Sequence, residues 1–332
     1  MRALLNSEPP DHTRLSVTTS RELAPTSVAK HELAVTAFID SLLDSIEPPV
    51  AFDAVPRLAA PLPTFAVARA MGVPEVFAHT LSPDGGTIDL RGIPTTCAHA
   101  QEIRADLTEN PRVLDATDAV EDMLWGDAAN GPAEAHSRAL QNIRDAVDAG
   151  SLTPAEAVAH VTEIVGAGLD ILTTLATSAL GLLLSHPDEL AKVRQNLDWI
   201  PMMLEEVLRF AAPIARVPRQ ARQDFEIDNI KIRQGDLVMG MVAIANRDPA
   251  QFVEPDRFQV DRFVEHRSIG HLTFGRGRHL CPGANLARQE VEILIRRMLE
   301  RFDDIQLVDD ELQWVPHWEV RQIGTLPIRI NS

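Results

Sequence analysis

The sequence predicts a mainly α-helical protein with small β-sheets, folded as one domain over residues 1–332. An apolar stretch begins after Thr153-Pro154 and ends at His186-Pro187, which are typical start and stop signals of a helix. At 1.5 Å per residue this helix is roughly 48 Å long, enough to cross a whole domain. Alternating residues with turn signals at 224–245, and a similar tail at 313–330, predict short strands.

The other helices are predicted from apolar spacing and from local start signals. Residues 27–46 and 132–149 have helix-like periodicity. Further helices are predicted at about residues 201–210 and 284–302. Helices therefore dominate every part of the chain except the two strand regions.

Composition and charge exclude several classes of protein. The formal net charge is 31 − 48 = −17, which argues against binding to nucleic acid or to an anionic membrane. The two cysteines, Cys97 and Cys281, do not make a disulfide framework. The N-terminus lacks the apolar core of a signal peptide, and the longest nearly apolar run, 171–184, is too short and too polar to span a bilayer. We therefore expect a soluble, cytoplasmic protein.

The segment from Phe274 to Gly283 has the most specific pattern in the chain. Cys281 follows a loop that contains Gly275 and Gly277, with His279 two residues before the cysteine. Glycine allows positive φ and a close backbone approach to a flat group. Neighbouring cations, a helix N-terminus or a metal lower the pKa of a thiol, so the pattern suits a cysteine that ligates a metal as thiolate. The alternative is a structural cysteine in a turn before a helix.

The spacing FGxGxHxCxG resembles the haem-binding loop of the cytochrome P450 family. The resemblance implies the fold of that family, haem b as cofactor, and Cys281 as the axial ligand of the iron. It also places Phe274, Gly275, His279 and Gly283 in the cofactor-binding loop. The segment PPDHTRL, which normally stands further into a bacterial member, begins here at Pro9. A member that lacks the usual N-terminal helix and part of the first sheet is therefore expected.

Two further motifs occur in the order that the family has. Glu206 and Arg209 form an ExxR pair, three apart on one predicted helix face. Arg257 follows in a Pro-Asp-Arg-Phe segment, before the cysteine loop. By resemblance, these three residues form a buried triad that braces the loop. The alternative for an ExxR pair is an ordinary surface ion pair.

Haem propionates need cationic or hydrogen-bonding partners. By resemblance, His12, Arg219 and His279 supply them, with Arg216 as a second arginine of lower rank. The family usually has an arginine four residues after the counterpart of His12, where this chain has Ser16. One of the usual propionate contacts is therefore missing at that position.

The long helix contains Ala167-Gly168-Leu169-Asp170-Ile171. By resemblance this stretch lies over the haem, where the small Ala167 and Gly168 leave room for a diatomic ligand and Asp170 takes part in proton delivery. Ile171 stands where the family has an alcohol, and isoleucine neither donates nor accepts a hydrogen bond. Thr173 and Thr174 are rotated roughly 200° and 300° from Ile171, so they do not replace that alcohol on the same face. The alternative is an apolar core helix with a satisfied aspartate.

The resemblance implies an oxidoreductase of the monooxygenase type (class EC 1.14) that acts on a small organic substrate, with Ile171, Ile214, Ala215 and Ile323 as pocket residues. Two alternatives stay open. The isoleucine at 171 favours a haem-thiolate enzyme that uses peroxide or catalyses a rearrangement, and the missing N-terminal region favours a non-catalytic relative that serves as a partner protein. No flavin or nicotinamide fingerprint is visible, so a separate ferredoxin and reductase are expected. Residues 267–301 carry seven arginines and three glutamates, which suits either an acidic redox partner or an ordinary solvated helix. On the shortened N-terminal side three alternatives are open: the pocket is open, a second copy or a partner covers it, or the chain begins at an internal start.

Overall fold

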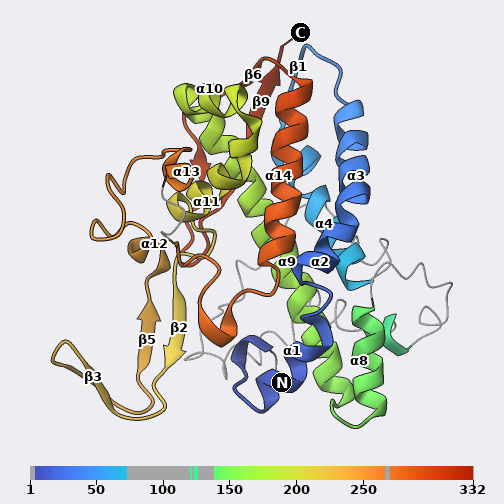
Figure 1. The fold of residues 1–332 in the computed structure, drawn as a ribbon, viewed down its shortest axis with the longest axis vertical. Coiled ribbons are helices and arrows are strands. Elements are labelled where there is room, and N and C mark those ends of the chain that lie inside the picture. Colours follow the sequence, from blue (N-terminus) through green and yellow to red (C-terminus); the bar gives the residue numbers. More distant parts are fainter. Residues whose placement is uncertain (1–3, 73–119, 122, 126–137, 266–269, 332) are drawn as a thin grey trace.

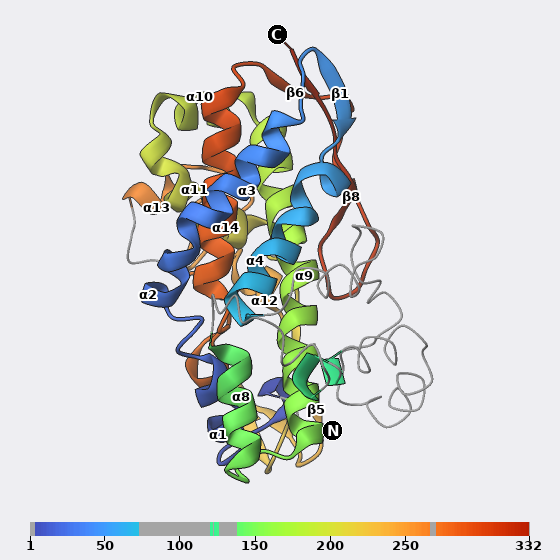
Figure 2. The ribbon, with the colours of Figure 1, turned by 90° about the vertical axis from the view of Figure 1, so that its right-hand side faces the viewer.

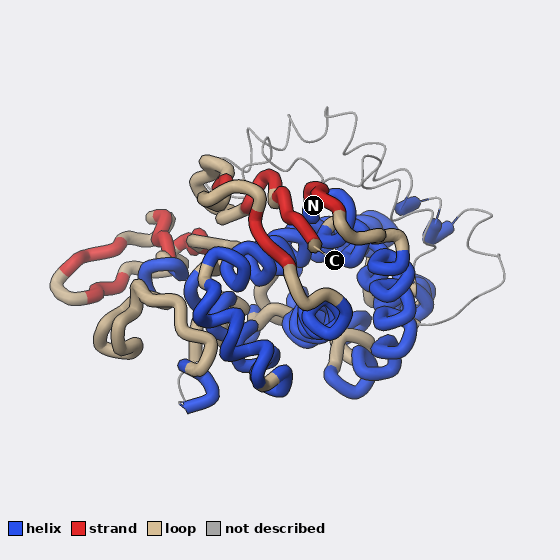
Figure 3. The backbone as a smooth tube through the Cα atoms, turned by 90° about the horizontal axis from the view of Figure 1, so that it is seen from above, coloured by secondary structure: helices blue, strands red, loops and turns tan. Residues whose placement is uncertain are grey.

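The computed structural model describes residues 4–72, 120–121, 123–125, 138–265 and 270–331. Within these residues the helices form the body of the protein, and the strands lie at its edges (Figure 1). Seen from above, a long hairpin projects from one side of the helical body (Figure 3). This arrangement confirms the mainly α class with small sheets.

Helix α9 (Pro154–Ser185) is the central element and runs through the molecule (Figure 1). Its start is a capping box, in which the Thr153 hydroxyl accepts the backbone N–H of Glu156, and the Glu156 carboxylate accepts the backbone N–H of Thr153. The helix is long and apolar enough to cross a membrane, but 78% of its most apolar window is buried inside the protein. A core helix of a globular fold has this property.

Four other helices pack against α9 or against each other around it: α3 (Glu32–Asp44), α4 (Pro61–Met71), α11 (Ile200–Phe210) and α14 (Ala284–Arg301). Their apolar faces share one continuous core with α9. The remaining helical elements are short or peripheral. They are η1 (Leu4–Asn6), α1 (Asp11–Thr19), α2 (Pro25–Val28), η2 (Ala29–His31), η3 (Val55–Ala59), α8 (Ala139–Asp148), α10 (Pro187–Gln195), η6 (Leu197–Trp199), α12 (Val242–Ala245), α13 (Arg262–Glu265) and η7 (Gly277–His279).

The described strands form four small antiparallel sheets. β1 (Val50–Asp53), β9 (Pro327–Ile330) and β6 (Ile305–Leu307) make a three-stranded sheet in that order, with Ile330 opposite both Val50 and Ile305. The other sheets have two strands each: β2 (Val217–Gln220) with β5 (Leu237–Gly240), β3 (Phe225–Ile227) with β4 (Ile230–Ile232), and β7 (Gln313–Trp314) with β8 (Ile323–Thr325). Figure 2 shows the segment that includes β8 descending beside α9.

The strand region predicted at 224–245 is correct up to residue 240 and wrong beyond it. The turn signal holds, because Asp228 and Asn229 adopt positive φ (48° and 67°) between β3 and β4. Residues 242–245, however, form helix α12. The buried side chain of Asn246 donates to the Thr273 hydroxyl and accepts the backbone N–H of Leu272, so the chain turns toward the loop before Cys281 instead of continuing the strand.

Helix α14 places the carboxyl group of Glu290 in the interior of the protein. Both side-chain oxygens of Glu290 are buried and have no hydrogen-bond partner among the described residues. Burial raises the pKa of Glu290 well above its usual value. The folded protein therefore keeps this proton over a pH range in which the unfolded chain, with a pKa near 4.5, has released it.

We expect Glu290→Gln to become progressively more stable than the parent as the pH rises above about 4.5. The folded parent binds more protons than the unfolded chain in this range, so its stability falls with pH by up to about 1.4 kcal/mol per unit until the raised pKa is reached. Urea unfolding at a series of pH values measures the difference. Glu292→Gln, on the partly exposed face of the same helix, is the control. If the free energy of unfolding changed with pH in the same way for the parent and for Glu290→Gln, Glu290 would be ionised in the folded protein.

Candidate active site

The loop before α14 is held by its own backbone. The N–H of Cys281 donates to the carbonyl of Phe274 at 2.8 Å, and the N–H of Gly275 donates to Leu272 at 2.8 Å. Gly275 and Gly277 have φ of 72° and 77°, as the sequence predicts for glycines in this loop. A Cβ on Gly275 would also lie 3.3 Å from the carbonyl oxygen of His279. The loop therefore requires glycine there for both its conformation and its packing.

The sulfur of Cys281 is half-buried at the N-terminus of α14 and accepts the backbone N–H groups of Gly283 and Ala284. Burial raises the pKa of the Cys281 thiol, while these two N–H groups and the charge of Arg288 act in the opposite direction. Burial has the larger effect, and the cation that acts on the sulfur is Arg288, not Arg276 or Arg278. A metal cation bound at this sulfur would favour its thiolate form.

The structure brings two of the predicted propionate residues together. The rings of His12 and His279 lie 4.7 Å apart, edge to face. Glu8 links His279 to Arg278: one of its oxygens lies 3.2 Å from Nε2 of His279, and the other accepts Arg278 at 3.1 Å. Burial, and then the charge of His279, lower the pKa of His12. The structure brings His12 and His279 together, and their binding to the propionates stays a prediction. Sequence reasoning did not identify Glu8 as the partner of His279 and Arg278.

Other residues that could contact a propionate, near α1 and on β2, bind elsewhere in the protein. Ser16, at the position of the usual arginine, donates to the carbonyl of Thr13. Arg14, the nearest guanidinium in sequence, is paired with Glu156 of α9 and with Asp11. Arg219 is exposed on β2 and donates to the carbonyl of Pro218 at 2.7 Å. Within the described residues, Arg219 therefore makes no contact with the His12–His279 pair.

A buried ion network lies behind the loop. The carboxylate of Glu206 binds Nε and Nη2 of Arg209 at 2.7 and 2.8 Å, and both side chains are 0% exposed. Arg262 is the third member, with Nε 3.1 and 3.2 Å from the two oxygens of Glu206. Its other nitrogens donate to the carbonyls of Val253 and Arg257, among others. The buried triad is confirmed for Glu206 and Arg209.

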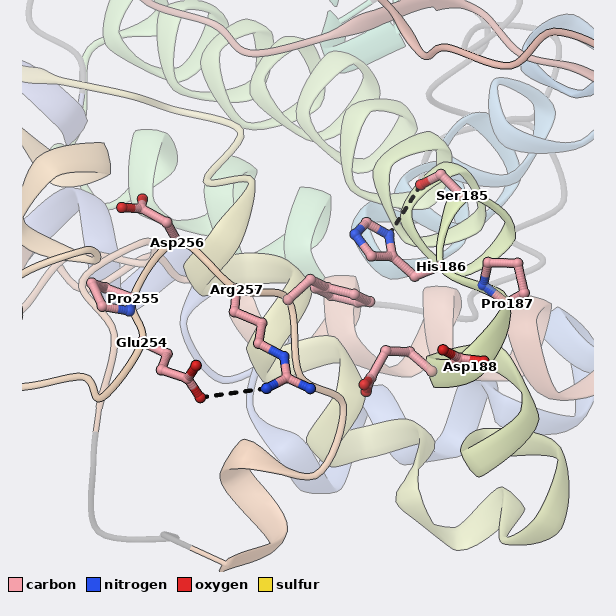
Figure 4. A pocket seen from close by; sticks show the side chains of 10 residues that line it. Ser185, His186, Pro187, Asp188, Glu254, Pro255, Asp256 and Arg257 are labelled. Carbon is pink, nitrogen blue, oxygen red and sulfur yellow. Dashed lines mark hydrogen bonds and ion pairs between the residues drawn. The ribbon is translucent and has the colours of Figure 1, made fainter.

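The prediction that Arg257 completes this triad is wrong. Its side chain is 58% exposed and lies 3.5 Å from Glu254, which is equally exposed. Only its backbone carbonyl takes part, by accepting Arg209 at 3.2 Å. Figure 4 shows Arg257 beside Glu254 in the lining of a hollow of about 690 Å³ that also includes Ser185. Ser185 is 14 residues beyond Ile171, so roughly 21 Å along α9, and this hollow is separate from the predicted haem face.

The middle of α9 is less buried than the segments on either side of it. Ala167 is exposed and Ile171, one turn later, is half-exposed, whereas Asp170 is buried. The hydroxyls of Thr173 and Thr174 donate to the carbonyls four residues before them at 2.9 Å and are buried. They are therefore not available to the face of Ala167 and Ile171, as the helical angles predict.

Gly168 has a different role from the predicted one. A Cβ there would come within 2.7 Å of Cγ2 of Val67 on α4. This glycine allows α4 to approach α9 closely, and it does not share the open face of Ala167. A small residue at this position could be predicted from the sequence, but its contact with a second helix could not.

The predicted pocket residues divide into two groups. Ile214 and Ala215 are half-buried, and both are fixed by pairing with the segment before β8, through an Ile214–Val320 bridge and an Ala215 N–H bond to Glu319. Ile323 is 0% exposed and belongs to the core, where its Cδ1 is 3.0 Å from the position of a Cβ on Gly181 of α9. The prediction for Ile323 as a pocket residue is therefore wrong.

The arginines of α14 are largely neutralised by acids from elsewhere in the fold. Each ion pair joins α14 to another element or to its own next turn: Arg288–Glu205, Arg296–Glu292, Arg297–Asp40 and Arg301–Asp44. The net positive charge of residues 267–301 is thus offset in space by α3 and α11. This pairing favours the ordinary solvated-helix interpretation over a dedicated basic surface.

The fold and the site together define the haem-thiolate class. A cysteine sulfur is held by N–H groups at a helix start, a buried Glu–Arg network lies behind its loop, and a long central helix exposes a small residue. The cytochrome P450 family model matches residues 127–316. Cytochrome P450 monooxygenase PikC of Streptomyces venezuelae is 32% identical over 338 residues, covering 98% of this chain and 75% of the relative.

Two solved structures are similar over almost the whole chain. P450BioI, in complex with an acyl carrier protein ligated to hexadec-9Z-enoic acid, matches with a TM-score of 0.82 and 26% identity, covering 98% of this chain and 81% of that one. The myxobacterial P450 CYP267B1, in complex with myristic acid, matches with a TM-score of 0.85 and 25% identity, covering 99% and 79%. The chain belongs to the cytochrome P450 family.

The cofactor of this family is haem b, and the residues of this chain fit it. The sulfur of Cys281 accepts two N–H donors, as a ligating sulfur does. The glycine loop leaves no side chain at Gly275 and Gly277, and the exposed Ala167 presents only a methyl group on the central helix. His279 and His12 supply polar groups beside the loop. The expected shortening at the N-terminus stays a prediction.

Proposed function

We propose that this protein, as one domain over residues 1–332, is a cytoplasmic haem-thiolate monooxygenase that oxidises a small organic substrate, with Cys281 as the axial ligand of iron. The observation that carries the proposal is the sulfur of Cys281, which accepts the backbone N–H groups of Gly283 and Ala284 at the start of α14. The similarity to a P450 named as a monooxygenase supports the reaction class. Hydroxylation, epoxidation and oxidative coupling all belong to that class.

Bound haem supplies the redox chemistry of oxygen, and the protein supplies orientation and electrostatics. The two N–H groups on Sγ spread the negative charge of the thiolate, which tunes the electron density that it donates. His12 and His279 bind the propionates and fix the orientation of the ring. The Glu206–Arg209–Arg262 network holds the segments on which the cysteine loop rests.

The acid–alcohol pair of the family is incomplete here. Asp170 keeps the carboxyl group, but Ile171 offers no proton, and the hydroxyls of Thr173 and Thr174 are committed to backbone carbonyls. The face of Ala167 and Ile171 therefore offers a neighbouring carboxyl group but no alcohol as a proton donor. This observation favours the second candidate function, a haem-thiolate enzyme that takes its oxygen from peroxide, because peroxide brings the required protons and electrons with it.

The two candidates differ in the oxidant that supports turnover. With myristic acid as a trial substrate, the purified holoprotein is supplied either with ferredoxin, ferredoxin reductase, NADPH and dioxygen, or with hydrogen peroxide alone. Product formed only with the first system supports the monooxygenase, and product formed only with peroxide supports the second candidate. No product with either system, from this and a panel of other small organic substrates, would count against both.

Restoring the hydroxyl should raise dioxygen-dependent turnover. We expect Ile171→Thr to increase the product formed per NADPH by up to about tenfold, which is less than the roughly 10²- to 10⁴-fold that a positioned acid or base contributes. Ile164→Thr, which adds the same hydroxyl two turns earlier on α9, is the control and should show no gain. Equal coupling in the parent and in Ile171→Thr would mean that proton delivery does not depend on position 171.

The predicted ferredoxin and reductase are part of this proposal. One of the two similar structures is a complex with a fatty acid, and the other is a complex with an acyl carrier protein that bears a fatty acid. These complexes support a substrate with a long apolar chain, which suits the apolar side chains of Ile171 and Ile214. We therefore infer a fatty-acid-like substrate or a carrier-bound form of one.

A further inference from the structure

Arg216 has a guanidinium that the fold leaves partly unused. It lies between the end of α11 and the start of β2 and is half-buried. Its Nε is buried and has no hydrogen-bond partner among the described residues. Leaving a buried charged donor unsatisfied costs more than a neutral one, so such a group usually has a ligand or a functional role.

Nε of Arg69 on α4 is likewise buried without a hydrogen-bond partner among the described residues, but three other arginines near the cysteine loop and the Trp318 segment bind groups of the protein itself. Arg209 and Arg262 spend their donors on Glu206 and on backbone carbonyls. Arg321 stacks on Trp314 at 4.5 Å, but it also donates to the carbonyl of Phe210. Arg216 also stacks on an aromatic ring, with its guanidinium 5.0 Å from the ring centre of Trp318, but its Nε has no hydrogen-bond acceptor among the described residues.

The surroundings hold Arg216 in place without neutralising it. Ala215 donates its N–H to the carbonyl of Glu319 at 2.8 Å, and Ile214 bridges Val320, so the Trp318 segment is fixed beside Arg216. Burial raises the pKa of Glu319, and the charge of Arg216 partly opposes that rise. Glu319 is thus the acid that Arg216 influences, but no ion pair within 4 Å joins these two described residues. Trp318 is 38% exposed, which leaves one side of the stack open to a ligand.

Arg216 and Arg219 differ in position and in exposure. Arg216 precedes β2, whereas Arg219 lies within β2 opposite Val238 of β5. Arg219 is exposed and was predicted to bind a haem propionate. Arg216 is next to Ile214 and Ala215, the half-buried residues that remain from the predicted pocket.

We propose that Arg216, backed by Trp318, binds the carboxylate of the substrate, so that the substrate class is long-chain organic acids in free form. This inference rests on the proposed function and deepens it. A guanidinium stacked on an aromatic ring keeps its donor edge available, and that edge matches a carboxylate in a two-point hydrogen bond. The half-buried Ile214 and Ala215 offer apolar contact to the alkyl chain beyond the carboxylate.

The test compares myristic acid with methyl myristate, which has the same chain without the charge. Both are titrated into the holoprotein, and binding is followed by the shift of the haem absorbance and by tryptophan fluorescence. The parent should bind the acid more tightly than the ester. Arg216→Gln should weaken acid binding by about ten- to a hundredfold and leave ester binding unchanged. Arg216→Lys should recover part of the loss, and Arg233→Gln, an exposed arginine on the β3–β4 side, should behave as the parent.

Three results would overturn the inference: an acid-to-ester ratio that is unchanged in Arg216→Gln, no binding of myristic acid to the parent, or loss of haem from Arg216→Gln. The last result would assign Arg216 to a propionate instead. The reduced carbon monoxide spectrum of each variant separates this inference from the proposed function. A normal thiolate spectrum with no preference for the acid contradicts only the carboxylate site, whereas an abnormal spectrum in the parent contradicts the proposed function.

Discussion

Arg262→Gln is expected to lower the free energy of unfolding by about 3 to 5 kcal/mol, the usual cost of removing one partner of a buried ion pair. Glu206 is 0% exposed and would lose one of its two guanidinium partners. Arg262 also donates to the backbone carbonyls of Val253, Glu254 and Arg257, and the variant would lose these partly buried hydrogen bonds. Urea unfolding, with the haem content of the purified protein as a second readout, measures the effect.

Arg257→Gln is the matched control, since it removes the same type of side chain five residues earlier. Its guanidinium is 58% exposed and faces an equally exposed Glu254. Surface pairs of this kind contribute little, and we expect a change within about 0.5 kcal/mol. If Arg257→Gln proved as destabilising as Arg262→Gln, the triad predicted from the sequence would be right and the observed network would be wrong.

Cys281→Ser is expected to remove the thiolate spectrum completely while the protein still folds. Serine is nearly isosteric with cysteine, and its oxygen can accept the same N–H groups of Gly283 and Ala284. A serine hydroxyl has a much higher pKa than a thiol, and oxygen is a harder ligand than sulfur, so the characteristic donation of electron density to iron is lost. Absorption of the reduced variant under carbon monoxide measures this change, and far-ultraviolet circular dichroism confirms the fold.

Cys97→Ser is the companion variant, because Cys97 is the other cysteine of the sequence and lies outside the described residues. We expect its spectrum to match that of the parent. If the thiolate signal were lost in Cys97→Ser and retained in Cys281→Ser, the ligand would be Cys97 and the proposal for Cys281 would be wrong.

Local patterns explain which parts could be predicted from the sequence. The bounds of α9 follow from Thr153-Pro154 and His186-Pro187, and the loop glycines follow from the need for positive φ. The ExxR pair is also local, since a helix brings Glu206 and Arg209 to one face. In each case residues close in the chain determine the outcome.

The third member of the triad shows where local patterns stop. The chain has Asp-Arg-Phe twice, at 256–258 and at 261–263, and both phenylalanines are buried. The sequence therefore offers two equivalent arginines five residues apart. Only the path of the chain past α11 decides that Arg262, and not Arg257, reaches Glu206. The repeated motif was the signal that could have raised Arg262 as a candidate.

Long-range packing accounts for the other corrections. Gly168 accommodates Val67 of α4, about 100 residues earlier, and no pattern around Gly168 shows this contact. The arginines at 297 and 301 meet acids of α3 that are more than 250 residues away. Ile323 was assigned to the pocket by resemblance, but its side chain packs on Gly181 in the core. Pairings at such separations require the folded structure.

The absorption spectrum of the purified parent protein, reduced under carbon monoxide, tests the central claim most directly. Ligation of haem iron by the sulfur of Cys281 predicts a Soret band shifted strongly to the red, as cysteine-thiolate haem gives in this family. Absence of haem from protein produced with haem available, or a band typical of histidine ligation, would contradict the claim.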